Sequence, residues 1–176
     1  MGMGTGLTLR TTLDGLAGPE RAGTLFLPAL AGTPDAILDL LALLPVCDVN
    51  GALTACLAGK GIGSGPAPVA AVFCTDPFLR VSDMAETLRA AGLRRVANYP
   101  SVQAIDGEPG RTIAAVGYGP DEEIATLVRL REAGLEPLGC AASAAFAARL
   151  DAAGIAPILA VPALGSGVTT FAPLPR

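Results

Sequence analysis

The sequence of 176 residues contains no histidine and no tryptophan, and its only lysine is Lys60. Without histidine, mechanisms that use it as the general base are excluded, including Ser-His-Asp and Cys-His arrangements. The four cysteines, Cys47, Cys56, Cys74 and Cys140, form no Cys-x-x-Cys pair. A zinc site needs closer cysteine spacing or histidine, so we expect reduced, buried thiols in a cytoplasmic protein.

Basic stripes and long apolar runs are also missing. The net charge is −4 and the arginines are scattered, which excludes nucleic acid as an expected partner. The longest apolar run, Ile37 to Val46, is interrupted by Asp39. It is much shorter than the ~20 residues of a membrane span. The N-terminus has no basic segment before an apolar one, so no secretory signal is expected.

The apolar content that remains is high, with 51% hydrophobic residues and a mean hydropathy of +0.53. This content predicts a buried core or an oligomer interface. The length suits one domain. We expect it to cover residues 1–164 and to be followed by a Gly- and Pro-containing tail at 165–176.

A β-α-β unit is predicted between Val69 and Asn98. Val69 to Phe73 is a short apolar run typical of a buried strand. Pro77 is expected to start a helix, with Val81, Met84 and Leu88 on its inner face. The next strand is expected at Arg95 to Asn98. In such units ligands bind at the carboxyl ends of the strands.

The same rhythm recurs along the chain. Helix, glycine and strand follow one another at Gly92, Gly134 and Gly154, which predicts an α/β fold with a parallel sheet. Four further helices are expected: one capped by Thr33 and carried by residues 37–44, and others capped by Asp48 or Asn50, by Asp121 and by Ser143. A helical face at Leu9, Leu13 and Leu16 is expected to end at Gly18. Strands are expected at 24–27, 135–139 and 155–161.

A glycine-rich segment, Gly59 to Gly65, permits two interpretations. It could be a phosphate-cradling loop, but a dinucleotide fingerprint follows a strand and opens a helix. This segment follows a predicted helix and leads into a predicted strand, which favours a flexible connection.

Several motifs resemble the TIM-barrel phosphoenolpyruvate hydrolase-like family in order and spacing. Cys74-Thr75-Asp76-Pro77-Phe78 resembles a strand end Gly-Thr-Asp-Pro-Phe of that family. The other similar segments are Gly4-Thr5-Gly6-Leu7, Leu44 to Asn50, Asn98-Tyr99-Pro100-Ser101-Val102, Ile105-Asp106-Gly107 and Gly117-Tyr118-Gly119.

The resemblance implies an incomplete TIM-barrel-like fold, with about five to six strands where a closed barrel has eight. A family glutamate is replaced at Ala114 to Val116, and a family His-Met-Gly corresponds to Val161 to Leu164. An unclosed barrel would leave two strand edges exposed. We therefore expect a homodimer or an obligate complex with a partner.

Strand ends also supply the candidate site. Asp76, Tyr118, Tyr99 and Cys74 are the candidate catalytic residues, with proton transfer by Asp76 and a tyrosine. The candidate substrate-binding residues are Thr75, Asn98, Asp106, Asp48, Asn50 and Cys140. Asp76 also suits a helix cap, Asn98 a loop cap and Asp106 a turn. Cys74 and Cys140 lack a histidine to activate them.

No cofactor is certain, although Asp76 and Asp106 could hold Mg²⁺ if they converge. Three interpretations of the chain remain open. It could be a repurposed lyase, cyclase or isomerase for a small enolic or carbonyl substrate in a specialised biosynthetic pathway. It could bind a ligand without turnover, or it could be a structural subunit that completes a partner's barrel.

Overall fold

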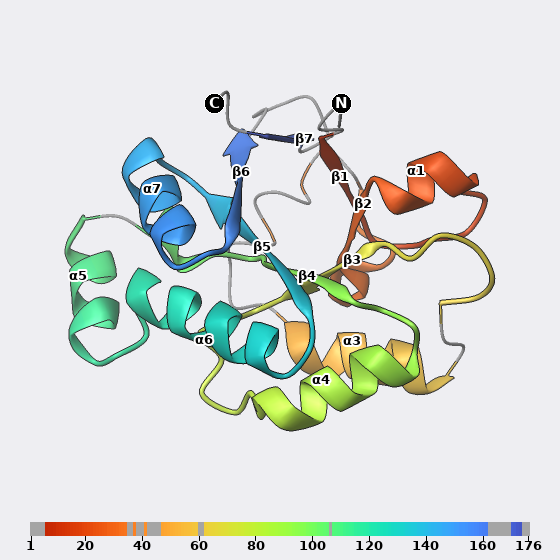
Figure 1. Cartoon of the computed structure of the whole chain (residues 1–176), viewed down its shortest axis with the longest axis horizontal. Helices are drawn as coiled ribbons and strands as arrows, with labels where there is room; N and C mark the ends of the chain where they lie inside the picture. Colours follow the sequence, from red (N-terminus) through yellow and green to blue (C-terminus); the bar gives the residue numbers. More distant parts are fainter. Residues whose placement is uncertain are drawn as a thin grey trace.

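The computed structural model describes residues 6–34, 37, 41, 47–59, 62–105, 107–161 and 170–173. Strands and helices alternate along most of this chain (Figure 1). The strands are β1 (Leu7–Arg10), β2 (Thr24–Phe26), β3 (Val69–Val72), β4 (Arg95–Asn98), β5 (Glu136–Ala141), β6 (Ala156–Val161) and β7 (Thr170–Pro173). The α-helices are α1 (Gly18–Ala22), α3 (Val49–Gly59), α4 (Val81–Ala90), α5 (Gly107–Ala115), α6 (Pro120–Glu132) and α7 (Ala144–Ala152), and short 3₁₀ helices are η1 (Pro28–Leu30) and η2 (Val102–Ala104).

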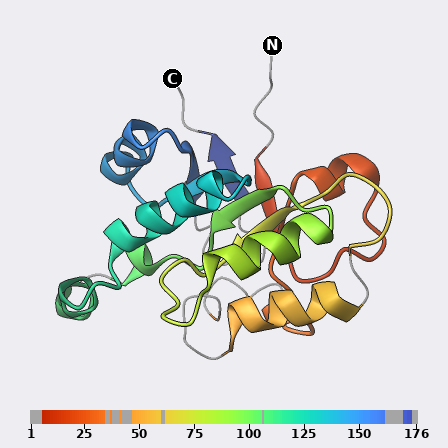
Figure 2. The ribbon, with the colours of Figure 1, turned by 60° about the horizontal axis from the view of Figure 1, so that its bottom comes forward.

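The sheet is a curled array of parallel strands. β1 to β6 pair in chain order, and every one of these pairings is parallel. Helices connect the strands and lie on the outside of the curl, as Figures 1 and 2 show together. The predicted α/β class, with parallel β/α repeats in an incomplete TIM-barrel-like arrangement, is therefore confirmed.

The two end strands of this array are joined by β7. β7 pairs antiparallel with both β1 and β6, so that the strands form a closed ring. The expectation of two exposed strand edges was therefore wrong. β7 comes from the segment expected to be a tail, and it pairs with β6, the strand before it, and with β1, which lies far from it in the sequence. A strand of this kind gains its stability from its neighbours more than from its own residues.

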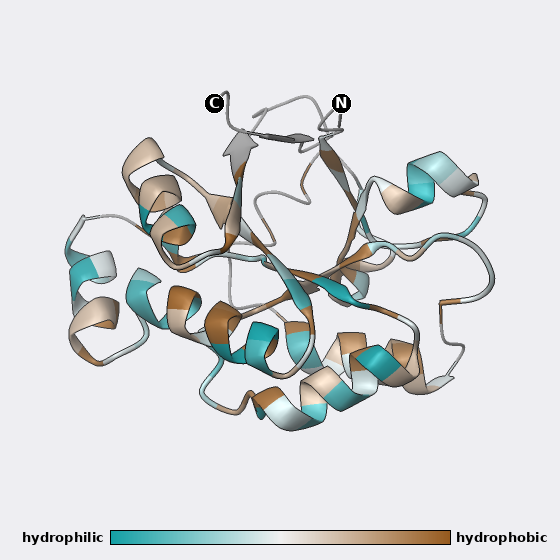
Figure 3. Cartoon of the chain, in the orientation of Figure 1, coloured by the Kyte–Doolittle hydropathy of each residue, from teal (hydrophilic) through white to brown (hydrophobic). Residues whose placement is uncertain are grey.

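Two apolar layers lie on either side of the sheet. Inside the ring, alternate side chains of the strands pack together, among them Leu9, Leu25 and Ala71. Outside it, the other strand positions pack against helices, as Val72 and Val96 do in one cluster with Leu88 and Leu127. Apolar and polar segments alternate along α3, α4 and α6, as expected for helices with one buried face (Figure 3).

Three predicted helix starts differ from the structure. α6 begins at Pro120 with Gly119 as its N-cap, so Asp121, the predicted cap, lies inside the first turn. The Leu9 spacing resembles a helix, but Leu7 and Leu9 point inward while Thr8 and Arg10 are half-buried, which makes β1 a strand. α4 begins at Val81 rather than at Pro77. The segment before it is a turn in which the Leu79 amide donates to the Asp76 carbonyl at 3.1 Å.

The predicted ends of three helices are confirmed by their glycines. Gly92, Gly134 and Gly154 follow α4, α6 and α7 with φ values of 78°, 86° and 72°. A side chain at such φ is strained, so glycine ends the helix at low cost. The predicted helix at 37–44 lies largely outside the described residues. Among the described helices, none is long and apolar enough to span a membrane.

The glycine-rich segment Gly59 to Gly65 starts at the last residue of α3 and falls in the connection to β3, which follows a helix and precedes a strand. This order disagrees with a dinucleotide fingerprint, which follows a strand and opens a helix. All four cysteines are free thiols, and two of them, Cys74 and Cys140, are buried. The expectation of buried thiols is confirmed for these two and is wrong for Cys47 and Cys56, which are half-buried.

Candidate functional site

Asn50 and Asp76 form the best-defined polar contact at the carboxyl end of β3. Asn50 lies in the first turn of α3 and is buried. Its Nδ2 donates to Asp76 Oδ2 at 2.9 Å and to the Phe73 carbonyl at 3.0 Å. Its Oδ1 accepts from the Phe73 amide at 3.0 Å. One side chain therefore fixes both the end of the strand and the carboxylate that follows it.

The second oxygen of Asp76 organises its own loop. Oδ1 accepts from the Phe78 amide at 2.8 Å, which is an Asx turn. This turn delays the start of α4 and leaves the carboxylate half-buried at the rim of the sheet. A carboxylate has about four lone-pair sites, so Asp76 can still accept from a bound molecule.

A small cavity lies beside Asp76, and we call it the Asp76 pocket. Its volume is about 220 Å³. The residues that line it come from the β3–α4 loop, the loop before α6, and α6 itself: Cys74, Thr75, Asp76, Pro77, Leu79, Gly117, Tyr118, Glu122, Thr126 and Arg129. The structure thus brings together four sequence-predicted residues, Cys74, Thr75, Asp76 and Tyr118.

Thr75 contributes a hydroxyl group that has no hydrogen-bond partner in the part of the chain that the structure describes. The residue is 3% exposed, and its Oγ1 is buried without a partner among the described residues. A buried hydroxyl in this state costs free energy. A bound molecule with an acceptor oxygen would recover that cost, which makes Thr75 a candidate ligand contact.

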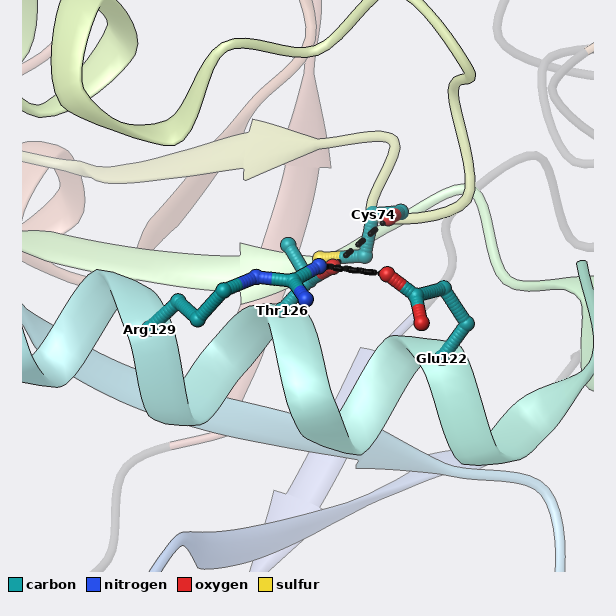
Figure 4. A network of polar contacts seen from close by, with 4 residues as sticks. All are labelled: Cys74, Glu122, Thr126 and Arg129. Carbon is teal, nitrogen blue, oxygen red and sulfur yellow. Dashed lines mark hydrogen bonds and ion pairs between the residues drawn. The ribbon is translucent and has the colours of Figure 1, made fainter. Parts of the chain in front are cut away.

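One wall of the pocket is a polar network on α6 (Figure 4). Arg129 forms an ion pair with Glu122 and donates to Thr126 Oγ1 at 2.7 Å. Thr126 in turn donates to the Cys74 carbonyl at 3.0 Å, which ties the helix to the end of β3. Arg129 and Glu122 were not predicted as site residues, because charged side chains on a helix usually face solvent.

The Cys74 thiol is unsuited to act as a nucleophile. Burial raises its pKa well above the ordinary value, and Glu123 and Cys140 raise it further. Burial also raises the pKa of the Cys140 thiol, and the nearby Glu123 carboxylate adds to this rise. Because the thiolate is the reactive form, both cysteines are neutral packing groups at physiological pH.

The two tyrosines lie in different environments. Tyr118 is 41% exposed and lines the Asp76 pocket, so that its phenol is accessible to a ligand. Tyr99 is 6% exposed and belongs to the apolar cluster inside the ring. Tyr99 does not line the Asp76 pocket, although its amide donates to the Val72 carbonyl near the end of β3 at 3.1 Å.

A second polar network surrounds Glu123, which is fully buried. Its carboxylate accepts from Asn98 Nδ2 at 2.9 Å, from Ser101 Oγ at 2.9 Å and from the Val102 amide at 2.8 Å. Gln103 Nε2 also donates to it at 3.0 Å. These donors come from the end of β4 and from η2, so that Glu123 holds this connection against α6.

Asn98 also joins β4 to β5. Its Oδ1 accepts from the Cys140 amide at 2.6 Å, and its Nδ2 donates to the Cys140 carbonyl at 3.2 Å. The predicted residues Asn98 and Cys140 therefore come together, but around Glu123 rather than beside Asp76. All the polar atoms of the Asn98 side chain are used within the protein.

Glu123 was missed in the sequence, although one signal was present. It lies four residues before Leu127, on the inner face that also carries Thr126 and Leu130. Burial raises the pKa of its carboxyl group, and the hydrogen bonds from Val102, Ser101, Asn98 and Gln103 oppose that rise.

Asp48 lines a different groove, which it shares with Asp76. Its Oδ1 accepts from the Gly51 amide at 2.7 Å, which confirms it, rather than Asn50, as the cap of α3. Asp48, Asn50 and Asp76 line a separate groove of about 270 Å³ with residues of α4. The predicted proximity of these three residues is thus present.

The Mg²⁺ hypothesis has less support. Asp106 lies outside the described residues, so its distance from Asp76 is not given by the structure. Within the described ranges, no group of three or more acidic or cysteine residues could hold a metal ion. Both oxygens of Asp76 already accept protein hydrogen bonds.

Comparison with known proteins agrees with this fold. The sequence model of a family described as phosphoenolpyruvate hydrolase-like matches residues 40–172. The uncharacterized protein y4oT of Sinorhizobium fredii is 36% identical over 151 residues, which are 85% of this chain and 76% of the relative. The region matched by the family model contains β3 to β6, most of β7 and the residues that line the Asp76 pocket. This chain therefore belongs to the phosphoenolpyruvate hydrolase-like family.

Proposed function

We propose that this chain is a shortened, divergent enzyme of its family that acts on a small enolic or carbonyl compound in the Asp76 pocket. The observation that carries the proposal is the joint presence of a fixed carboxylate, Asp76, and a buried hydroxyl without a partner, Thr75. Catalytic groups of barrel enzymes lie at the carboxyl ends of the strands, and these two residues follow β3.

The size of the pocket limits the substrate. At about 220 Å³, it is smaller than the roughly 300–1,000 Å³ of sites for drug-sized ligands. Substrates with few heavy atoms, such as short keto acids, fit this volume. Arg129 on the α6 wall offers a cation to one of their oxygens.

The chemistry that suits these groups is proton transfer next to a carbonyl. Asp76 would remove a proton from the carbon beside the carbonyl, and the electron pair would move to the carbonyl oxygen. Thr75 or Tyr118 would donate a hydrogen bond to that oxygen. Return of the proton to another carbon gives an isomer, while loss of a group from the enol gives a lyase reaction. No step of this reaction requires a cofactor.

We further infer a role as a lyase, cyclase or isomerase of a specialised biosynthetic pathway in the cytoplasm. The four free thiols support a reducing compartment. This finer assignment depends on the substrate that the pocket accepts.

A non-catalytic role is the second candidate. It is favoured by the protein hydrogen bonds to both Asp76 oxygens, which give this side chain a structural task. In that case the chain would bind a ligand without turnover. A subunit that completes a partner's barrel is less suited to this chain, since β7 already occupies the gap between β1 and β6.

The experiment that tests the proposal is proton exchange in D₂O, followed by ¹H NMR. Wild-type protein is incubated with pyruvate, oxaloacetate, acetoacetate and phosphoenolpyruvate. Protein-dependent loss of the proton signal next to a carbonyl, or conversion of the compound, is the expected result. Binding of these compounds without exchange or conversion would favour the non-catalytic role instead.

A further inference from the structure

A second cavity, apart from the Asp76 pocket, takes no part in the proposed reaction. It measures about 590 Å³ and lies between η2, α5, the start of α6 and α7; we call it the α5–α7 cavity. The residues that line it are Val102, Gln103, Ile105, Gly107, Gly110, Arg111, Ile113, Ala114, Gly119, Pro120, Ala142, Ser143, Ala145, Phe146 and Arg149. None of them lines the Asp76 pocket.

The cavity exists because α5 does not pack closely on the barrel. No residue of α5 is buried, and the helix lies at the periphery in both views (Figures 1 and 2). Its side chains therefore leave space unfilled between α5 and α7. A volume of this size falls in the range of about 300–1,000 Å³ that is typical of small-molecule sites.

The charged side chains described in the lining are all positive. Two arginines, Arg111 and Arg149, contribute to it, and no acidic side chain does among the described residues. This is unusual in a chain of net charge −4. Arg111 is exposed and forms no hydrogen bond or ion pair with the described residues.

Arg149 forms one ion pair, at the surface. It pairs with Asp121, whose side chain is 86% exposed. Surface pairs of this kind contribute little, so Arg149 keeps donors for a ligand. A guanidinium group suits carboxylate and phosphate groups because its donors are arranged in a planar fork.

The remaining walls are largely apolar. Ile105 and Ile113 face the cavity from the α5 side, and Phe146 faces it from α7. The Arg149 guanidinium lies over the Phe146 ring, 5.5 Å from its centroid. Cations and an aromatic wall thus meet at one side of the same space.

We propose that the α5–α7 cavity is a second binding site, for a small organic anion with an apolar body. A carboxylate or phosphate group of the ligand contacts Arg111 and Arg149. An aromatic or branched aliphatic body packs against Ile113 and Phe146. The charge sign and the apolar walls are independent observations, and together they select amphipathic anions over inorganic ions and over neutral apolar compounds.

The test is an NMR titration of ¹⁵N-labelled full chain with phenyl phosphate and, separately, with benzoate. Benzyl alcohol and inorganic phosphate are the matched probes that lack the charge or the apolar body. We expect saturable shifts of amides in α5 and at the start of α7 for at least one aromatic anion. The tighter of the two identifies the preferred head group. We expect weaker binding of both matched probes.

Arg111→Gln and Arg94→Gln are the paired variants. Arg94 is exposed and precedes β4, at the opposite end of the strands. Loss of a charged hydrogen bond predicts that Arg111→Gln weakens binding about tenfold or more, while Arg94→Gln leaves it unchanged. Because Arg111 has no partner among the described residues, its variant should keep the wild-type spectrum.

Three results would overturn the proposal. The first is the absence of saturable shifts in α5 and α7 with either aromatic anion. The second is equal weakening by Arg94→Gln, which would indicate attraction by overall charge alone. The third is equal binding of benzyl alcohol and phenyl phosphate, which would remove the role of the arginines.

Discussion

Asn50 Nδ2 lies 2.9 Å from Asp76 Oδ2 and joins two residues that are 26 positions apart in the sequence. The same amide group also holds the Phe73 carbonyl, and the Asn50 oxygen accepts the Phe73 amide. The conformation of the strand end and the position of the carboxylate therefore depend on one buried side chain. This dependence leads to the first prediction.

Replacement of Asn50 by alanine should destabilise the protein and misplace Asp76. The Phe73 amide and carbonyl would lose their partners, at a cost of about 1–3 kcal/mol for a buried group left unsatisfied. Urea unfolding followed by circular dichroism measures this change. Thr54→Ala is the control, since Thr54 lies on the same helix and donates only to the Asn50 carbonyl. Equal effects of both substitutions would show that the Asn50 contacts contribute nothing special.

The Glu123 carboxyl group predicts a pH dependence of stability. Its pKa is raised in the folded protein, chiefly by burial, so the folded state binds the proton more tightly than the unfolded chain. Its contribution to stability is fully present below the unfolded pKa of about 4.3. That contribution is lost as pH rises through the folded pKa.

Glu123→Gln isolates this term, with Glu132→Gln as the control at the exposed end of the same helix. The variant should be less stable, since its amide group faces several donors, at a cost of about 1–3 kcal/mol for each donor left unpaired. The difference in unfolding free energy between wild type and variant should shrink as pH increases from 4 to 8. A difference that grows with pH would mean that the four hydrogen bonds outweigh burial.

Gly139 is expected to tolerate no side chain. It lies in β5, where an added Cβ would overlap the Leu150 side chain of α7. Gly139→Ala should therefore lower the free energy of unfolding by about 1–3 kcal/mol, as overpacking does. Gly59→Ala at the end of α3 is the matched control, because nothing lies within 4 Å of the added Cβ there. Thermal unfolding compares the two, and similar melting temperatures would contradict the packing of α7 on β5.

The homodimer stays a prediction, but it no longer depends on exposed strand edges. β7 removes the exposed edges, but Phe78 is 88% exposed and Val116 is 66% exposed. Exposed apolar residues of this size suggest contact with another chain. Light scattering should give twice the chain mass of 17.5 kDa, and Phe78→Ser should shift the mass toward one chain. A wild-type mass of one chain at all concentrations would contradict the prediction.

The central part of the fold was predictable because its signals are local. The apolar run at Val69 and the inner face with Met84 and Leu88 correspond to β3 and α4. Gly92 marks the helix end through its own backbone conformation. Such features depend on neighbours within a few residues, so they can be predicted from the sequence alone.

The parts that were missed depend on distant partners. β7 is a strand because β1 and β6 pair with it. Glu123 is buried because donors about twenty residues earlier, at Ser101 and Val102, satisfy its oxygens. Without such partners, a carboxylate in the first turn of a helix is expected to face solvent, where it interacts favourably with the helix dipole.

The candidate site was predictable in part for the same reason. The sequence order placed Thr75 and Asp76 at a strand end, and the motif resemblance added Tyr118 beside them. Arg129 belongs to the pocket only because α6 packs against the β3–α4 loop. Arg129 donates to Thr126, and Thr126 donates to the Cys74 carbonyl of that loop. Tyr99 follows β4 but faces the ring interior, and no local signal distinguished it from Tyr118.

The most direct test of the account is the rate of proton exchange catalysed by Asp76→Asn, on whichever keto or enolic acid reacts with wild type. Loss of a general acid–base group predicts a rate about 10²–10⁴-fold lower. Asp151→Asn, at an exposed position near the end of α7, should keep the wild-type rate. A lower rate in Asp76→Asn alone is the result we predict. Wild-type exchange by a folded Asp76→Asn protein would contradict the assignment of Asp76 as the proton-transferring group.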